Sequence, residues 1–146
     1  MKIRHLTNQR GIVAVEFALV SIILFMLLIG IMEMGRMLFY WNSATEATRL
    51  GARVAVVCAP GAAAIKDRMT ALFPAIATAD IQVAYLPDAC DASSCTHVTV
   101  SILQTAPLQI SIPFVPLQLM MPSSSTTLPR ESMRSSIAGF ANPVCG

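Results

Sequence analysis

The sequence predicts an α+β fold: one long N-terminal helix crosses a membrane and continues into a small exported domain. That domain is expected to hold a short second helix and a small antiparallel sheet. Three observations predict this arrangement: an apolar run over residues 12–32, a helix-compatible continuation to residue 57, and alternating apolar and polar residues further on. The chain has 146 residues, of which 55% are hydrophobic and 12% charged, so we expect one small domain plus an anchor.

The apolar run is long enough to span a bilayer. A helix from Ile12 to Met32 covers roughly 31 Å, which matches the hydrocarbon thickness of a membrane. Glu16 is the one charged residue inside it, and burying a carboxylate there costs on the order of 3 kcal/mol. Either Glu16 reaches back to the membrane surface, or it has a partner in an assembled protein. We assign residues 12–33 to the transmembrane helix and residues 34–146 to the exported domain.

Basic residues before the apolar run predict the orientation of the anchor. Lys2, Arg4 and Arg10 precede the run and no acidic residue accompanies them, so the N-terminus is expected to stay in the cytoplasm. A cleaved secretory signal would have a shorter apolar core, about 7–15 residues, followed by a small-residue cleavage site. No such site follows here. The span is therefore expected to be retained as a single-pass anchor in contact with membrane lipid.

Beyond the membrane the helix is expected to continue to Val57. Tyr40 and Trp41 lie where an outer aromatic belt would be. An amphipathic stripe with three- and four-residue spacing follows, and its small residues are expected to pack on the chain's own sheet: Met34, Leu38, Trp41, Thr45, Thr48, Ala52 and Ala55. Glu46 and Arg49 lie on neighbouring turns of the polar face. Pro60 and Gly61 end the helix.

A second helix and an antiparallel hairpin are expected next. Residues 62–73 have an apolar face and end before Pro74. Residues 81–86 and 97–104 alternate between apolar and polar side chains, and they are expected to pair across a loop that contains Cys90 and Cys95.

The last third of the sequence is less regular. Residues 107–122 are apolar but contain four prolines, which excludes a second membrane helix and leaves an edge strand or an apolar loop on the bilayer. Residues 123–127 are interpreted as a polar linker, and residues 127–137 as a final strand.

The four cysteines all follow the predicted membrane span. An even number of cysteines in an oxidising compartment favours disulfides, and four cysteines allow three pairings. We favour Cys90–Cys95, which closes a short loop. That choice leaves Cys58–Cys145, which would tie the end of the chain to the long helix.

No catalytic, metal or nucleic-acid site is expected. Cys90, Asp91, Cys95 and His97 are metal-ligand types, but their C-x4-C-x-H spacing matches none of the usual zinc patterns, and a disulfide would consume both thiolates. The sequence contains no glycine-rich phosphate loop and no basic stripe interleaved with aromatics. We therefore expect a non-enzymatic protein without a cofactor, a metal or a nucleic-acid partner.

The start of the apolar run resembles the processing site of type IV pilin-like precursors. Gly11 is followed by four apolar residues and then by Glu16 and Phe17. In such precursors a prepilin peptidase cuts after the glycine and methylates the new amino terminus. The resemblance implies that residues 1–11 are a cytoplasmic leader removed between Gly11 and Ile12. It also implies that Glu16 and Phe17 serve peptidase recognition and assembly.

A wider stretch, residues 10–57, resembles the TadE-like pseudopilins of tight-adherence (Tad, or Flp) pilus systems. The matching residues are Arg10, Gly11, Ala14, Val15, Glu16, Phe17, Ala18, Leu19, Gly30, Glu33, Gly35, Arg36, Ala47, Arg49, Gly51, Ala52 and Arg53. The resemblance implies a minor pseudopilin in the inner membrane, with its domain in the periplasm or incorporated in the pilus. Its implied partners are the prepilin peptidase, other pilins and pseudopilins, and the inner-membrane assembly platform.

A second reading of the same features stays open. The protein would be a membrane-anchored periplasmic binding or scaffold module whose anchor is not cleaved. Processing after Gly11 and a requirement for Glu16 distinguish the two hypotheses.

Overall fold

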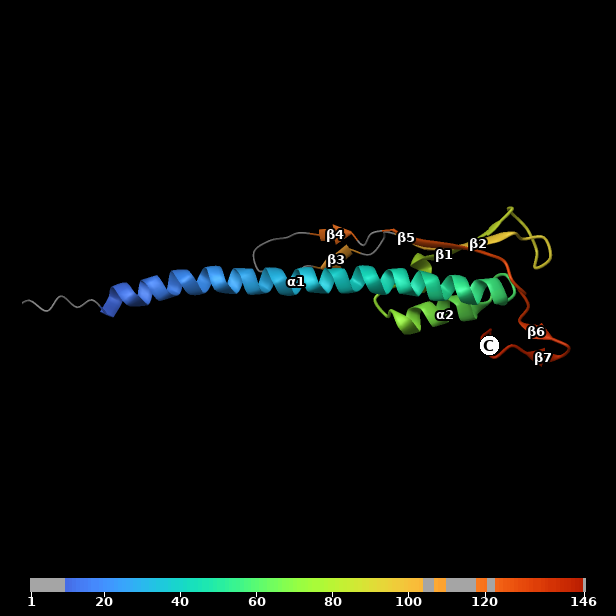
Figure 1. Cartoon of the computed structure of the whole chain (residues 1–146), viewed down its shortest axis with the longest axis horizontal. Coiled ribbons are helices and arrows are strands. Elements are labelled where there is room, and N and C mark those ends of the chain that lie inside the picture. The colour runs from blue at the N-terminus through green and yellow to red at the C-terminus, as the bar shows by residue number, and fades with distance from the viewer. Residues whose placement is uncertain (1–9, 104–106, 110–117, 121–122, 146) are drawn as a thin grey trace, which may run out of the picture.

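One long helix organises the molecule. The computed structural model describes residues 10–103, 107–109, 118–120 and 123–145. Helix α1 (Arg10–Val57) continues without interruption from the apolar run into the domain and ends at Val57, as predicted. Helix α2 (Ala63–Leu72), a short 3-10 turn η1 (Thr78–Asp80) and the strands gather around the C-terminal half of α1 (Figure 1). The fold class is the α+β arrangement that the sequence predicts.

The main sheet has three antiparallel strands. They are β1 (Ile81–Leu86), β2 (His97–Ile102) and β5 (Ser124–Pro129), in the order β1-β2-β5. The predicted hairpin of β1 and β2 is confirmed, although β2 ends two residues earlier than expected. Val98, Val100 and Ile102 alternate with more exposed residues and are buried, so the period-two pattern correctly identified the inner face of the sheet.

The core lies where α1, α2 and the sheet meet. Its members come from all three: Ala47, Ala52 and Ala55 of α1, Ile65 and Met69 of α2, and Ile81, Val98, Val100 and Ile102 of the sheet. The small residues of α1 thus pack on the chain's own domain, as expected. The apolar stripe predicted for the preceding turns is wrong, since Met34, Leu38 and Trp41 are exposed. Apolar side chains near a membrane face lipid as readily as a core, so the pattern did not distinguish the two.

The end of α1 is held by a distant part of the chain. The final carbonyl groups of a helix have no partner within it. Here the carbonyl oxygen of Val56 accepts from the amide of Met133 at 3.1 Å, and that of Val57 accepts from the amide of Arg134 at 2.8 Å. These contacts use the amides that a strand over residues 127–137 would have needed. The predicted strand therefore stops at Pro129, and only β6 (Ser136–Ile137) pairs again, with β7 (Phe140–Ala141).

The predicted linker at residues 123–127 is also wrong, because β5 begins at Ser124. Its inner positions carry Ser124 and Thr126, which hydrogen-bond to Thr48 of α1. The strand was not predicted because the side chains on its covered face are polar, so the sequence shows no alternation of apolar and polar residues there.

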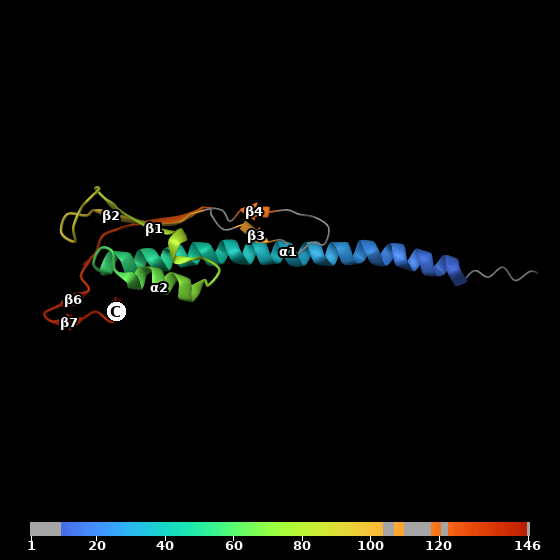
Figure 2. The ribbon, with the colours of Figure 1, turned by 180° about the vertical axis from the view of Figure 1, so that it is seen from behind.

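A separate two-stranded ribbon stands between β2 and β5 in the chain. Strands β3 (Pro107–Gln109) and β4 (Gln118–Met120) pair with each other, with Pro107 opposite Met120, and not with the main sheet. The rest of the predicted edge strand or loop over residues 107–122 lies outside the described residues. In both Figure 1 and Figure 2 the ribbon lies beside the middle of α1.

Candidate functional site

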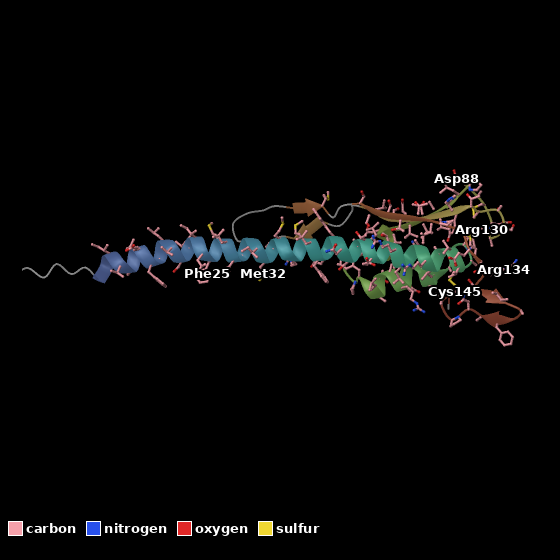
Figure 3. The ribbon with its side chains drawn as sticks, viewed as in Figure 1. Phe25, Met32, Asp88, Arg130, Arg134 and Cys145 are labelled. Carbon is pink, nitrogen blue, oxygen red and sulfur yellow. A yellow bond between two sulfur atoms is a disulfide. The ribbon has the colours of Figure 1, made fainter. Side chains whose placement is uncertain are left out.

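The N-terminal half of α1 is the candidate site. From Gly11 to Leu28 every side chain except the half-buried Ser21 is exposed, and Figure 3 shows these side chains standing free of the domain. Phe17 is 73% exposed and Met32 70%. The helix is long and apolar enough to cross a membrane, and none of its most apolar stretch is buried within the molecule. We therefore describe it as a single-pass membrane anchor.

The residues expected to carry processing and assembly lie together at the start of this half. Gly11, Ile12, Val15, Glu16 and Leu19 line one shallow apolar surface of α1. Ile12 and Glu16 are four residues apart, so their side chains lie on the same face, one turn apart. Phe17 lies about 100° further around the helix than Glu16. Among the described residues no hydrogen bond or ion pair engages the Glu16 carboxylate.

A second acidic residue on α1 was not singled out as a site by the sequence. Glu33 directly follows the apolar run over residues 12–32 and is only 8% exposed, while Met32 and Met34 on either side are largely exposed. Its Oε2 lies 3.3 Å from a guanidinium nitrogen of Arg36, and that guanidinium lies 6.0 Å from the ring centre of Tyr40. An opposite-charge pair three residues apart, immediately after an apolar run, was the signal available in the sequence.

The disulfide candidates are brought together in the pairing that the sequence favoured. Cys90 and Cys95 join across the β1–β2 loop, and Cys58 at the end of α1 joins Cys145. Figure 3 places Cys145 beside the far end of α1 from the anchor.

The loop closed by Cys90 and Cys95 contains one strongly hydrogen-bonded carboxylate. Oδ1 of Asp91 accepts from the amide and hydroxyl groups of both Ser93 and Ser94, at 2.6–2.8 Å. These bonds stabilise the charged form and hold the pKa of Asp91 far below its usual range. The Asp91 carboxylate therefore stabilises the conformation of its own loop.

Residues 11–53 match a family model described as TadE-like protein. This segment of the chain is TadE-like. The resemblance predicted from the sequence is thereby confirmed for this segment. No curated protein and no solved structure matches the chain.

The TadE-like match follows the architecture of α1. It begins at Gly11, runs through the exposed half of the helix and ends at Arg53 inside the packed half. The matched segment therefore contains the anchor and the small-residue surface that receives the domain, and α2 and the strands lie outside it. The matched segment thus lies entirely within α1, the helix that also carries the candidate site.

Proposed function

We propose that this protein is a pseudopilin-like assembly component of a Tad pilus, inserted in the inner membrane by α1. Its domain lies in the periplasm, and it joins neighbouring subunits through the N-terminal half of α1. The observation that carries the proposal is the TadE-like match over a helix whose residues 11–28, apart from the half-buried Ser21, are all exposed. An apolar helix of this kind is stable only against lipid or against other helices.

Processing after Gly11 is the first step of the proposed mechanism. Cleavage there removes the basic leader and leaves an amino group on Ile12. In the assembled state this cation meets the Glu16 carboxylate of a neighbouring subunit. Two groups that are each costly to bury then neutralise one another. The uncut precursor has no amine at this position, so processing permits assembly.

The processing step is tested by mass spectrometry of the mature amino terminus. A Gly11→Leu variant should remain in the membrane at full length. Gly30→Leu is the matched control, since neither glycine has a neighbour within 4 Å of an added Cβ, and it should be cut normally. A native protein that begins at Met1, or beyond Met32, would favour the uncleaved binding or scaffold module.

The assembly step is tested with Glu16→Gln, which removes the anion and keeps the size of the side chain. The variant should insert at least as well as wild type, because a neutral amide is cheaper to bury than a carboxylate. Crosslinking to partner subunits and pilus production should be lost. Glu46→Gln removes an exposed carboxylate beyond the span and should assemble normally. Wild-type levels of crosslinked complex and pili in Glu16→Gln would overturn the proposed pairing.

The orientation is tested through the cysteines. The basic residues ahead of the apolar run favour a domain outside the cytoplasm, where thiols oxidise. Alkylation without reduction should then label none of the four cysteines in protein taken from its native envelope. Free reaction of all four would overturn the periplasmic location.

A further inference from the structure

Strand β1 is an edge of the main sheet, and it pairs only with β2. The amide of Leu103 donates to the carbonyl oxygen of Asp80 at 2.8 Å, and this bond sets the alternation along the strand. Every second residue from Gln82 onward therefore directs its backbone groups toward β2, whereas Val83 and Tyr85 direct theirs away from the sheet. Among the described residues no hydrogen bond engages these outward backbone groups.

The opposite edge of the sheet is protected, and β1 is not. The amide of Arg130 donates to the carbonyl oxygen of Thr96 at 3.0 Å, so the same alternation turns Pro129 of β5 outward. Proline has no amide hydrogen, and proline or charged residues on an edge strand discourage further pairing. Strand β1, with the sequence IQVAYL, contains neither. Its open edge is therefore a template on which another strand can pair.

A cleft of about 490 Å³ lies beside this open edge. Its walls are β1 and the start of α2, which contributes Ala63 and Lys66. The amide of Gly61 donates to the hydroxyl of Tyr85 at 3.1 Å, and the ammonium group of Lys66 donates to the carbonyl oxygen of Thr78 at 3.2 Å. These two bonds join the α2 side of the cleft to the β1 side, so the cleft is already formed before anything binds.

The chemistry of the edge and of the cleft identifies what fits them. Outward amide and carbonyl groups on alternate residues repeat about every 6.8 Å, and an extended polypeptide presents acceptors and donors at the same spacing. Every second side chain of such a strand would point into the cleft. The cleft is lined by small and apolar side chains such as Ala63 and Ile65, and Lys66 is the one charged residue among the described residues that line it.

The position of β1 limits the possible occupants. In both Figure 1 and Figure 2 the main sheet lies beside the half of α1 that is remote from the anchor, and its strands run along the helix. A bilayer around the anchor does not reach this edge. Two copies anchored in one membrane point the same way, so β1 of one copy cannot pair antiparallel with β1 of the other.

We propose that the open edge of β1 binds an extended segment of a partner polypeptide, which adds a fourth strand to the three-stranded sheet. The backbone of the segment pairs with the outward groups of Val83 and Tyr85. Its alternate side chains enter the cleft, where the lining favours apolar residues and an acidic residue next to Lys66.

Amide hydrogen exchange of the full-length protein tests the proposal, read at single residues by mass spectrometry with electron-transfer fragmentation. Exchange is compared between native envelope vesicles and protein purified in detergent. In purified protein the amides of Val83 and Tyr85 should exchange rapidly, and those of Gln82 and Ala84, which face β2, slowly. In the envelope the amides of Val83 and Tyr85 should exchange about tenfold more slowly than in purified protein.

Two variants connect this protection to the cleft. Ala63→Trp fills the cleft with a bulky side chain, and Ala71→Trp is the matched control, because it replaces an exposed alanine of the same helix outside the cleft. In the envelope, Ala63→Trp should restore rapid exchange at Val83 and Tyr85, and Ala71→Trp should not. Intact disulfides and unchanged exchange of the amides that face β2 show that each variant is folded.

Equal exchange of Val83 and Tyr85 in the envelope and in purified protein would overturn the proposal. Slow exchange in purified protein at every dilution would also overturn it, because the chain itself would then cover the edge. Slow exchange in purified protein only at high concentration would replace the partner segment by a second copy. Envelope protection that Ala63→Trp leaves unchanged would contradict binding in the cleft. The amides belong to this chain, so none of these outcomes depends on membership of a Tad pilus.

Discussion

Gly51 lets α1 approach α2 and β2 at once. A Cβ atom built on this residue would collide with the side chain of Met69 and would lie 3.2 Å from Cγ1 of Val100. Glycine is a poor helix former, so its presence here reflects packing and not propensity. The contact between two helices and a strand depends on the absence of one side chain.

Gly51→Val should therefore destabilise the domain by about 1–3 kcal/mol, the usual range for overpacking a core. Gly35→Val is the matched control on the same helix, because no atom lies within 4 Å of a Cβ at that position. Thermal unfolding in detergent, followed by near-UV circular dichroism, measures the difference. Equal loss in both variants would contradict the packing argument.

The ionisation of Asp91 is controlled by hydrogen bonds within its own loop. Its hydrogen bonds from Ser93 and Ser94 depress the pKa of the folded state below the ordinary value of 3.8. A depressed pKa means that the carboxylate stabilises the loop fully above pH 3.8. The stabilisation is lost as the pH falls through the lower, folded pKa.

A titration of the Asp91 side chain by NMR should show a midpoint well below pH 3.8. The Ser93→Ala and Ser94→Ala double variant removes two hydroxyl donors and keeps both amides, so the midpoint should rise toward that value. A midpoint that does not move would mean that the hydroxyl groups do not hold the charge.

At the scale of elements, β5 is joined to α1 by hydroxyl groups. The Thr48 hydroxyl is fully buried and donates to the carbonyl oxygen of Thr45 at 2.9 Å. Thr126 donates to it at 3.1 Å, and the Ser124 hydroxyl lies 3.2 Å away. These hydroxyl groups thereby hold β5, which has few apolar side chains, against a part of α1 whose buried side chains are small.

Thr48→Val should cost about 1–3 kcal/mol, because it leaves the Ser124 and Thr126 hydroxyl groups without their shared partner. Adding Ser124→Ala and Thr126→Val should recover most of this loss, since the whole polar group is then replaced by apolar atoms. Chemical denaturation of the wild type, Thr48→Val and the triple variant measures both changes. A triple variant less stable than Thr48→Val alone would show that the hydroxyl network is not what joins the two elements.

At the scale of the whole molecule, the two disulfides differ in what they enclose. Cys58–Cys145 joins residues 87 positions apart, whereas Cys90–Cys95 spans five. Restriction of the unfolded chain grows with the length of the enclosed loop. The long disulfide therefore holds the C-terminal segment, which also caps α1 through Met133 and Arg134, against the far end of the helix.

Replacing Cys58 and Cys145 by alanine should lower the stability of the domain by about 4–5 kcal/mol, against about 2 kcal/mol for Cys90 and Cys95, from chain entropy alone. Each pair contains one fully buried cysteine, so the packing losses are comparable. Denaturation of the two double variants in detergent measures the ratio. Equal losses would mean that loop length does not govern the contribution of either disulfide.

Local patterns in the sequence were enough to predict the elements that are determined by residues close together in the chain. The anchor follows from an uninterrupted apolar run, β1 and β2 from alternation, and the end of α1 from Pro60 and Gly61. The TadE-like character also resides in one continuous stretch, residues 11–53, and was visible without coordinates. These features depend on neighbours along the chain, which is what a sequence displays.

Tertiary structure alone decided the features that depend on distant partners. Strand β5 was missed because its inner residues are satisfied by Thr48, some 76 residues away in the chain. The segment after Pro129 is not a strand because its amides serve the carbonyl groups at the end of α1. A hydrophobic pattern records which side chains avoid water, but only the assembled fold determines whether the core, the membrane or a neighbour covers them.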